Sequence, residues 1–177
     1  MKKIIVLTAI VIAAIGTGVY LLFLKEPVFK ATNGYLVNLN NKGVIIEGYD
    51  VVSYFTGDKP VKGNEKYMTV YQGATYWFSS AANADLFKND PQKYAPQYGA
   101  FCGYAVSIGK LRPVDPLIYQ IENGRLILQH TQEAYELFNK DLKQNTSKAD
   151  NNWPGIVANH VGKPVQYDKP AQAAISK

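Results

Sequence analysis

Cys102 is the only cysteine among the 177 residues, and its side chain is the one best suited to chemistry. An ionised thiol can act as a nucleophile, a redox centre or a ligand for a soft metal ion. Nearby cations or a helix N-terminus favour that ionised form. The alternative is a small buried hydrophobic side chain, which is how many free cysteines behave. Cys102 is therefore the first candidate for a reactive or metal-binding residue.

His130 and Met68 are the residues that could extend Cys102 into a site. Cys102 and His130 would form a nucleophilic pair in a thiol enzyme if the fold brings them together. With Met68 they would supply the thiolate, imidazole and thioether ligands that soft metal ions prefer. This set is small, because closed metal sites usually have three or four strong ligands. His130 could equally cap a helix or face solvent.

Other patterns that indicate catalysis are absent from the sequence. There are no paired carboxylates typical of glycosidases, no Gly-x-Ser-x-Gly elbow, no phosphate loop and no dinucleotide fingerprint. We expect Asp50 to cap a short helix and Asp115 to lie in a turn between prolines. Tyr94, Tyr98 and Tyr104 either line a pocket or, as we expect, fill an aromatic core.

An apolar run without any charged residue covers residues 4–24, and Lys2 and Lys3 precede it. A helix of that length is about 30 Å long, enough to cross the hydrocarbon core of a membrane. The two lysines favour a cytoplasmic N-terminus and a domain outside the cytoplasm. The alternative is a cleaved signal peptide followed by secretion. Either way the domain is exported, to a compartment where disulfides are permitted although Cys102 has no partner in the chain.

The net charge of +5 does not indicate a nucleic-acid-binding protein. Residues 26–159 are balanced in charge, so the excess comes from the two ends of the chain: Lys2, Lys3, Lys25, Lys163, Lys169 and Lys177 against Asp168. Nucleic-acid binding requires a basic face on the folded domain. The apolar content of 47% and the thirteen tyrosines indicate a folded domain.

Strands and helices that must position these residues follow one another irregularly. We expect strands at 44–46, 66–71, 75–78, 118–122 and 125–129, with a tight Asn123-Gly124 turn between the last two. We expect helices at 50–55, 80–89, 91–97 and 131–144. This order predicts an α+β fold: a small antiparallel sheet built from hairpins and packed with several short helices, preceded by an N-terminal transmembrane or signal helix.

The sequence divides into four segments. They are a signal anchor or signal peptide at 1–25, a linker at 26–43, a folded domain at 44–156 and a flexible C-terminal tail at 157–177. Trp153 and Pro154 are expected to close the folded domain as a hydrophobic plug.

The block from Tyr71 to Ser107 resembles the YHS domain family. The matching residues form a long ordered string of aromatic, proline and glycine positions: Tyr71, Gly73, Tyr76, Phe78, Ser79, Phe87, Asp90, Pro91, Lys93, Tyr94, Pro96, Gln97, Tyr98, Gly99, Cys102, Tyr104, Ala105, Val106 and Ser107. The resemblance extends over residues 44–156, including the Gly48-Tyr49-Asp50 stretch. It implies that this segment is one YHS-like domain.

The resemblance also implies a function. YHS domains are linked to heavy-metal proteins, including copper-transporting ATPases, and exported relatives are described as (seleno)proteins with selenocysteine at the position of Cys102. The first link implies binding of a copper-like soft metal ion, and the second implies thiol redox chemistry. This chain departs from the metal-binding pattern, because Gln72 replaces the family histidine and Ser79 replaces a cysteine found in some members.

Together these observations predict an exported, membrane-anchored YHS-domain accessory protein. Its role would be binding or thiol redox chemistry centred on Cys102, including binding of a copper-like metal ion. Its partners would be the membrane, through residues 4–24, and a protein or metal ion outside the cytoplasm. One alternative is a peroxidase- or reductase-like enzyme that uses Cys102 and His130, and another is a purely structural interaction domain.

Overall fold

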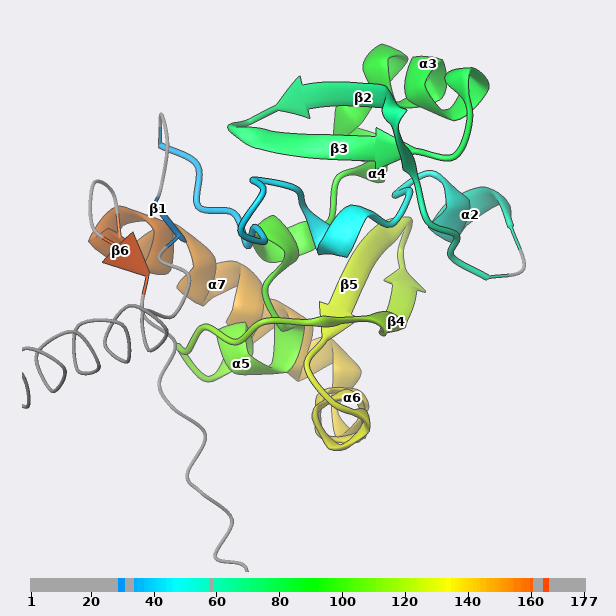
Figure 1. Ribbon diagram of the computed structural model, residues 1–177. Helices are drawn as coiled ribbons and strands as arrows, with labels where there is room; N and C mark the ends of the chain where they lie inside the picture. Colours follow the sequence, from blue (N-terminus) through cyan, green and yellow to red (C-terminus); the bar gives the residue numbers. More distant parts are fainter. Residues whose placement is uncertain (1–28, 31–33, 58, 161–163, 166–177) are drawn as a thin grey trace, which may run out of the picture.

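A computed structural model of the chain describes residues 29–30, 34–57, 59–160 and 164–165 (Figure 1). The predicted anchor or signal helix at residues 4–24 lies outside this part. Within it, no helix combines the length and the apolar character needed to cross a membrane. The described part consists of small antiparallel sheets and several helices, which confirms the α+β class.

The first hairpin joins β2 (Asn64–Tyr71) to β3 (Ala74–Phe78) through a turn at Gln72 and Gly73. Both turn residues have a positive φ, of 49° and 79°. Ala74, Tyr76 and Phe78 are buried while the residues between them are partly exposed. This alternation is expected for a strand with one face on a core, and the hairpin confirms the prediction.

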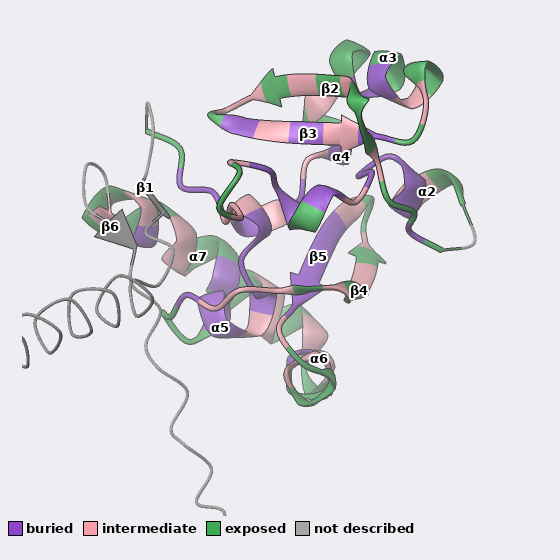
Figure 2. Cartoon of the chain, in the orientation of Figure 1, coloured by how far each residue is buried: buried purple, intermediate pink, exposed green. Residues whose placement is uncertain are grey.

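The second hairpin joins β4 (Asp115–Glu122) to β5 (Arg125–Gln129). Asn123 and Gly124 both have a positive φ, of 50° and 74°, as a tight hairpin turn requires. Figure 2 shows that β5 is buried along most of its length, while β4 is more exposed. The predicted pairing of 118–122 with 125–129 is confirmed.

The two hairpins do not join, so the prediction of one sheet built from them is wrong. Each forms its own two-stranded sheet, and a further two-residue pair links β1 (Phe29–Lys30) to β6 (Pro164–Val165). The free edge of β3 is taken by the chain before it, since Thr75 accepts the N–H of Ile45 and donates its own N–H to Gly43.

The predicted strand at 44–46 is correspondingly reduced to isolated bridges at Val44 and Ile45. A 3-10 turn, η1 (Ile46–Gly48), follows immediately. Ile46, Glu47 and Gly48 all have left-handed backbone, with φ between 47° and 78°. The β-branched residues at 44–46 favour a strand, but the left-handed turn that begins at Ile46 prevents the strand from continuing.

Short helices lie on both sides of the first hairpin in the sequence. Helix α2 (Ser53–Thr56) precedes it, and α3 (Ala81–Asn89), α4 (Pro91–Tyr94), η2 (Gln97–Ala100) and α5 (Gly103–Ser107) come after it. Ser80 caps α3 by accepting the N–H of Asn83 at 3.1 Å. Asp90 caps α4 in the same way. The helices predicted near 50–55 and 80–89 are thus present, whereas α4 ends at Tyr94, before the limit predicted at residue 97.

The C-terminal helices differ from the prediction. The chain forms α6 (Gln132–Lys140) and α7 (Leu142–His160) in place of one helix at 131–144. Asp141 breaks the helix with non-helical backbone, at φ −144° and ψ 73°, and then caps α7 by accepting the N–H of Gln144. Helix α7 continues through Pro154, which removes one backbone donor without ending it. Residues 157–160, predicted as the start of the tail, are therefore helical.

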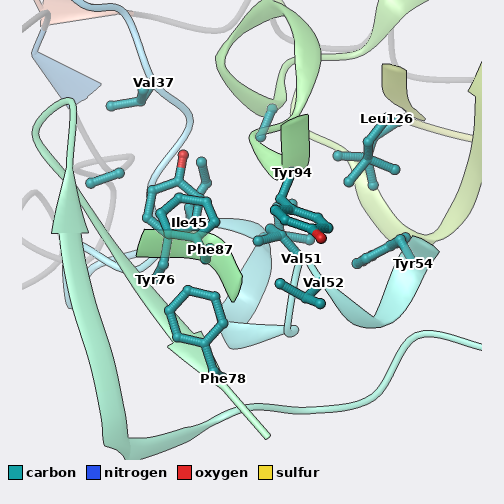
Figure 3. Close-up of a cluster of buried hydrophobic side chains, with 14 of the residues drawn as sticks. Val37, Ile45, Val51, Val52, Tyr54, Tyr76, Phe78, Phe87, Tyr94 and Leu126 are labelled. Atoms are coloured by element: carbon teal, nitrogen blue, oxygen red, sulfur yellow. The ribbon is translucent and has the colours of Figure 1, made fainter. Parts of the chain in front are cut away.

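Two hydrophobic clusters form the core. The larger one packs the inner face of β3 against α2, α3 and α4, and includes Val51, Phe78, Phe87 and Tyr94 (Figure 3). The smaller one lies among α5, α6, α7 and β5, and includes Phe101, Val106, Ile127, Phe138 and Ala149. The clusters place η2 and the start of β5 beside α7.

Candidate functional site

Cys102 is buried directly before α5, with 1% of its surface exposed. Its thiol donates to Oε1 of Gln129 at 3.1 Å, and the same oxygen accepts the N–H of Tyr104 at 3.0 Å. Gln129 is fully buried at the end of β5. The thiol therefore lies inside the protein, between α5 and the second hairpin.

Burial raises the pKa of the Cys102 thiol. The backbone N–H groups of Ala105, His130 and Tyr104 and the charge of Arg112 lower it, but they do not outweigh burial. At any given pH the thiol is therefore less ionised than an exposed cysteine. In this arrangement Cys102 is a packed core residue.

The three residues proposed as soft-metal ligands do not fit one site. The backbone N–H of His130 lies against Cys102, but Met68 lies on β2, in the other hairpin, and is 51% exposed. Figure 1 shows β2 and α5 at opposite ends of the domain. Among the described residues, no group of three or more His, Cys, Asp or Glu could hold a metal ion.

Alkylation of Cys102 should be more than about 100-fold slower in the native chain than in denaturant, because the thiol must be exposed by local opening before it reacts. The rate of iodoacetamide labelling, followed by mass spectrometry at pH 8, measures this. An exposed cysteine in α7, made as Ser147→Cys in a Cys102→Ser chain, is the control and should react at the same rate in both conditions. Equal native rates for Cys102 and this control would show that Cys102 is accessible.

A cleft of about 660 Å³ opens on the surface of the described part of the chain. It is lined by residues 34–37, the turn of the first hairpin, residues 92–99, Arg125 and one face of α7. Its volume is in the range of sites that bind small molecules. Five separate segments of the chain therefore meet around one space.

One wall of the cleft is a hydrogen-bonded group of four polar side chains, here called the polar wall: Gln97, Tyr98, Arg125 and Asp150. Arg125 donates from Nη1 to Oδ2 of Asp150 at 3.0 Å and from Nη2 to Oδ1 at 2.6 Å. Arg125 Nη2 also donates to Oε1 of Gln97 at 2.9 Å, and the hydroxyl of Tyr98 donates to Oδ1 of Asp150 at 2.9 Å. Bidentate arginine–carboxylate pairs of this kind hold both groups in a fixed geometry.

The polar wall keeps one charge state over the neutral pH range. The hydrogen bond from Arg125 lowers the pKa of Asp150 and raises the pKa of Arg125. Burial, followed by the hydrogen bond to Asp150, raises the pKa of Tyr98. Asp150 is thus ionised, Arg125 is charged and Tyr98 is neutral, so the wall is polar without net charge.

Aromatic rings supply much of the remaining lining. Trp153 follows Asp150 by three residues on α7, so it lies on the same face of the helix. Its ring centroid is 6.0 Å from that of Tyr98, at an angle of 68°. Tyr35 is 43% exposed and Tyr71 is partly exposed. The cleft therefore combines flat apolar surfaces with the polar wall.

The backbone below the polar wall is strained. Tyr98, Gly99 and Ala100 are all left-handed, with φ of 54°, 57° and 63°. Such a conformation costs about 1–3 kcal/mol at each non-glycine residue, and it concentrates at ligand sites and switches. The strain therefore supports the cleft as the functional surface.

Arg125 and Asp150 were not predicted as functional residues, and Trp153 was expected only as a hydrophobic plug. Tyr98 was considered for a pocket but expected in the core, and it belongs to both, since its ring is buried while its hydroxyl lies in the polar wall. The spacing of Asp150 and Trp153 would have indicated a shared helix face. Pro154 instead suggested the end of the domain.

The fold and the cleft define an α+β domain with a potential ligand-binding surface. Residues 52–98 match the family model described as YHS domain, which confirms the predicted resemblance over this part of residues 44–156. The match ends at Tyr98, while Arg125, Asp150 and Trp153 lie beyond it. The chain matches no curated protein and no solved structure.

Proposed function

We propose that this chain is a ligand-binding accessory protein whose YHS domain is held outside the cytoplasm by an N-terminal membrane anchor. The observation that carries the binding role is the 660 Å³ cleft with its pre-organised polar wall. Groups already fixed by mutual hydrogen bonds lose little entropy when a ligand binds. The proposal for the anchor rests on the apolar residues 4–24 and the lysines before them.

The cleft is a better candidate than Cys102 because it is accessible. Asp150 and Arg125 have side-chain exposures of 43% and 31%, whereas Cys102 is 1% exposed. A ligand can reach the polar wall without any opening of the fold. Binding through this surface also requires neither a resolving cysteine nor a metal ion.

A screen of neutral low-molecular-weight fragments by saturation-transfer NMR tests the proposal on the full chain in detergent. We expect a subset to bind with Kd of about 1 mM or better, as is usual for small ligands of this kind. Their signals should weaken in Tyr35→Ala and in Asp150→Asn. Leu117→Ala is the matched control, because Leu117 is 60% exposed on β4 and is not among the cleft residues.

Two results would contradict the proposal. One is that no fragment gives a signal with the wild-type chain. The other is that all signals are equal in Tyr35→Ala, Asp150→Asn and Leu117→Ala, which would place binding elsewhere.

A further inference from the structure

From the chemistry of the cleft lining, we infer that the cleft binds a neutral carbohydrate, with a sugar ring against Trp153 or Tyr35 and hydroxyl groups on the polar wall. This inference rests on the proposed binding function and specifies the class of ligand. It assigns recognition of the ligand both to residues outside the matched segment 52–98 and to residues at the C-terminal end of that segment.

The charges of the cleft favour a neutral ligand. Arg125 and Asp150 are the only charged residues among those that line the described cleft, and they neutralise each other in a bidentate pair. A charged ligand would lose hydration without gaining an unpaired counter-charge, which disfavours it. Nucleic acid is disfavoured for the same reason, because it needs a basic surface.

The hydrogen-bonding capacity of the polar wall favours a ligand with several hydroxyl groups. A carboxylate can accept about four hydrogen bonds, and Asp150 accepts three within the wall. Arg125 has five N–H donors, and the three short bonds of the wall use three of them. The wall thus offers both an acceptor and donors at one place, and a hydroxyl group can satisfy either.

The aromatic rings beside the wall favour a ligand with an apolar face. A sugar ring presents C–H groups on its faces and hydroxyl groups around its edge. Trp153 and Tyr35 offer partly exposed rings for the face, next to the polar groups that suit the edge. The amides of Gln72 and Gln92 add further polar groups around the cleft.

A proline-rich peptide is the competing occupant of an aromatic groove, and the polar wall argues against it. Such peptides have few N–H groups and depend on donors from the protein, including tyrosine hydroxyls, to bind their carbonyl groups. The hydroxyl of Tyr98 already donates to Asp150, so within the wall only the side chains of Arg125 and Gln97 could donate to the carbonyl groups of such a peptide. The accepting capacity that remains on Asp150 suits a ligand that donates.

Fluorescence of Trp153 can test the inference directly. The chain has two tryptophans, so Trp77→Phe leaves Trp153 as the reporter in the full chain. The probes are maltotriose, cellotriose and N,N′,N″-triacetylchitotriose, with the cationic glucosamine trimer, the anionic galacturonate trimer and hexaproline for comparison. The detergent must lack a sugar headgroup, because an alkyl maltoside would compete; lauryldimethylamine oxide is suitable.

We expect at least one neutral trisaccharide to change Trp153 fluorescence saturably, with Kd of about 10 µM to 1 mM. Both charged trimers should bind at least about tenfold more weakly. Asp150→Asn should weaken binding about 5- to 100-fold, since it removes a charged acceptor. Tyr35→Ala tests the aromatic surface independently, and Leu117→Ala should leave Kd unchanged.

The outcomes separate the inference from the proposed function. If fragments bind in the cleft but no neutral trisaccharide does, the carbohydrate assignment is wrong and the binding function stands. Binding of hexaproline without any sugar would assign the cleft to a peptide instead. If neither fragments nor sugars bind, both proposals are wrong.

Discussion

Replacing Gly99 with alanine is expected to lower the free energy of unfolding by about 2–5 kcal/mol. A Cβ at this position would collide with the carbonyl oxygen of Leu36 and lie 3.2 Å from the Cα of Val37. Both contacts are with backbone, which cannot rotate away as a side chain can. The left-handed φ of 57° adds the usual penalty for a residue with a Cβ. Urea unfolding of the full chain measures the change.

Gly109→Ala is the matched control for Gly99→Ala. Gly109 also has a left-handed φ, of 75°, but a Cβ there would meet nothing within 4 Å. Gly109→Ala should therefore lower the free energy of unfolding only by the conformational penalty of about 1–2 kcal/mol. The difference between the two variants isolates the collision with the segment at 36–37, which also lines the cleft. Equal losses would mean that this segment moves aside freely.

Asp50→Asn should lower the free energy of unfolding by about 3 kcal/mol, because it disrupts a fully buried carboxylate. Asp50 Oδ1 accepts the N–H of Val52, and Oδ2 accepts the N–H and hydroxyl of Ser79 and the amide of Asn83, all within 2.7–2.9 Å. All four partners donate. The NH₂ group of an asparagine would take the place of one accepting oxygen. It would then face at least one of these donors, and neither group could form its hydrogen bond.

Asp115→Asn is the control for the carboxylate of Asp50. Asp115 accepts one bond, from the N–H of Leu117, at an exposed position. Its replacement should change stability by about 0.5 kcal/mol or less. Denaturant midpoints of the two variants at pH 7 provide the comparison, and a loss in Asp50→Asn as small as that in Asp115→Asn would contradict the structural role of Asp50.

The local structure could be read from the sequence wherever a short signal is sufficient. Asn123-Gly124 predicted a tight turn, and the starts predicted for the helices at 80–89 and 91–97 agree within one residue with those of α3 and α4, because such signals act on the local backbone. The predicted capping role of Asp50 is wrong, because α2 follows Val52 and has no side-chain cap. The carboxylate of Asp50 instead accepts the N–H of Val52 and ties the chain before α2 to Ser79 and Asn83, which are about 30 residues away in the sequence. Ser79, which stands where some YHS domains have a cysteine, thus has a structural partner here.

The cleft could not be predicted because it depends on long-range packing. Arg125 and Asp150 are 25 residues apart, and they meet only because α7 packs beside β5 and η2. The left-handed backbone at Tyr98 and Ala100 has no sequence signature, since neither residue favours it. The burial of Cys102 could not be predicted either, because a family resemblance indicates which residue stands at a position but not how deeply it is buried.

The strand β5 has a consequence for how the domain unfolds. Leu126 and Leu128 belong to the larger hydrophobic cluster, while Ile127, between them, belongs to the smaller one. If either cluster unfolded, one face of β5 would therefore lose the side chains that it packs against. A fragment ending at Tyr98, the limit of the family match, would lack β5 altogether and leave the larger cluster incomplete. The matched segment is therefore not an autonomous folding unit, and we expect both halves of the domain to melt in a single cooperative transition.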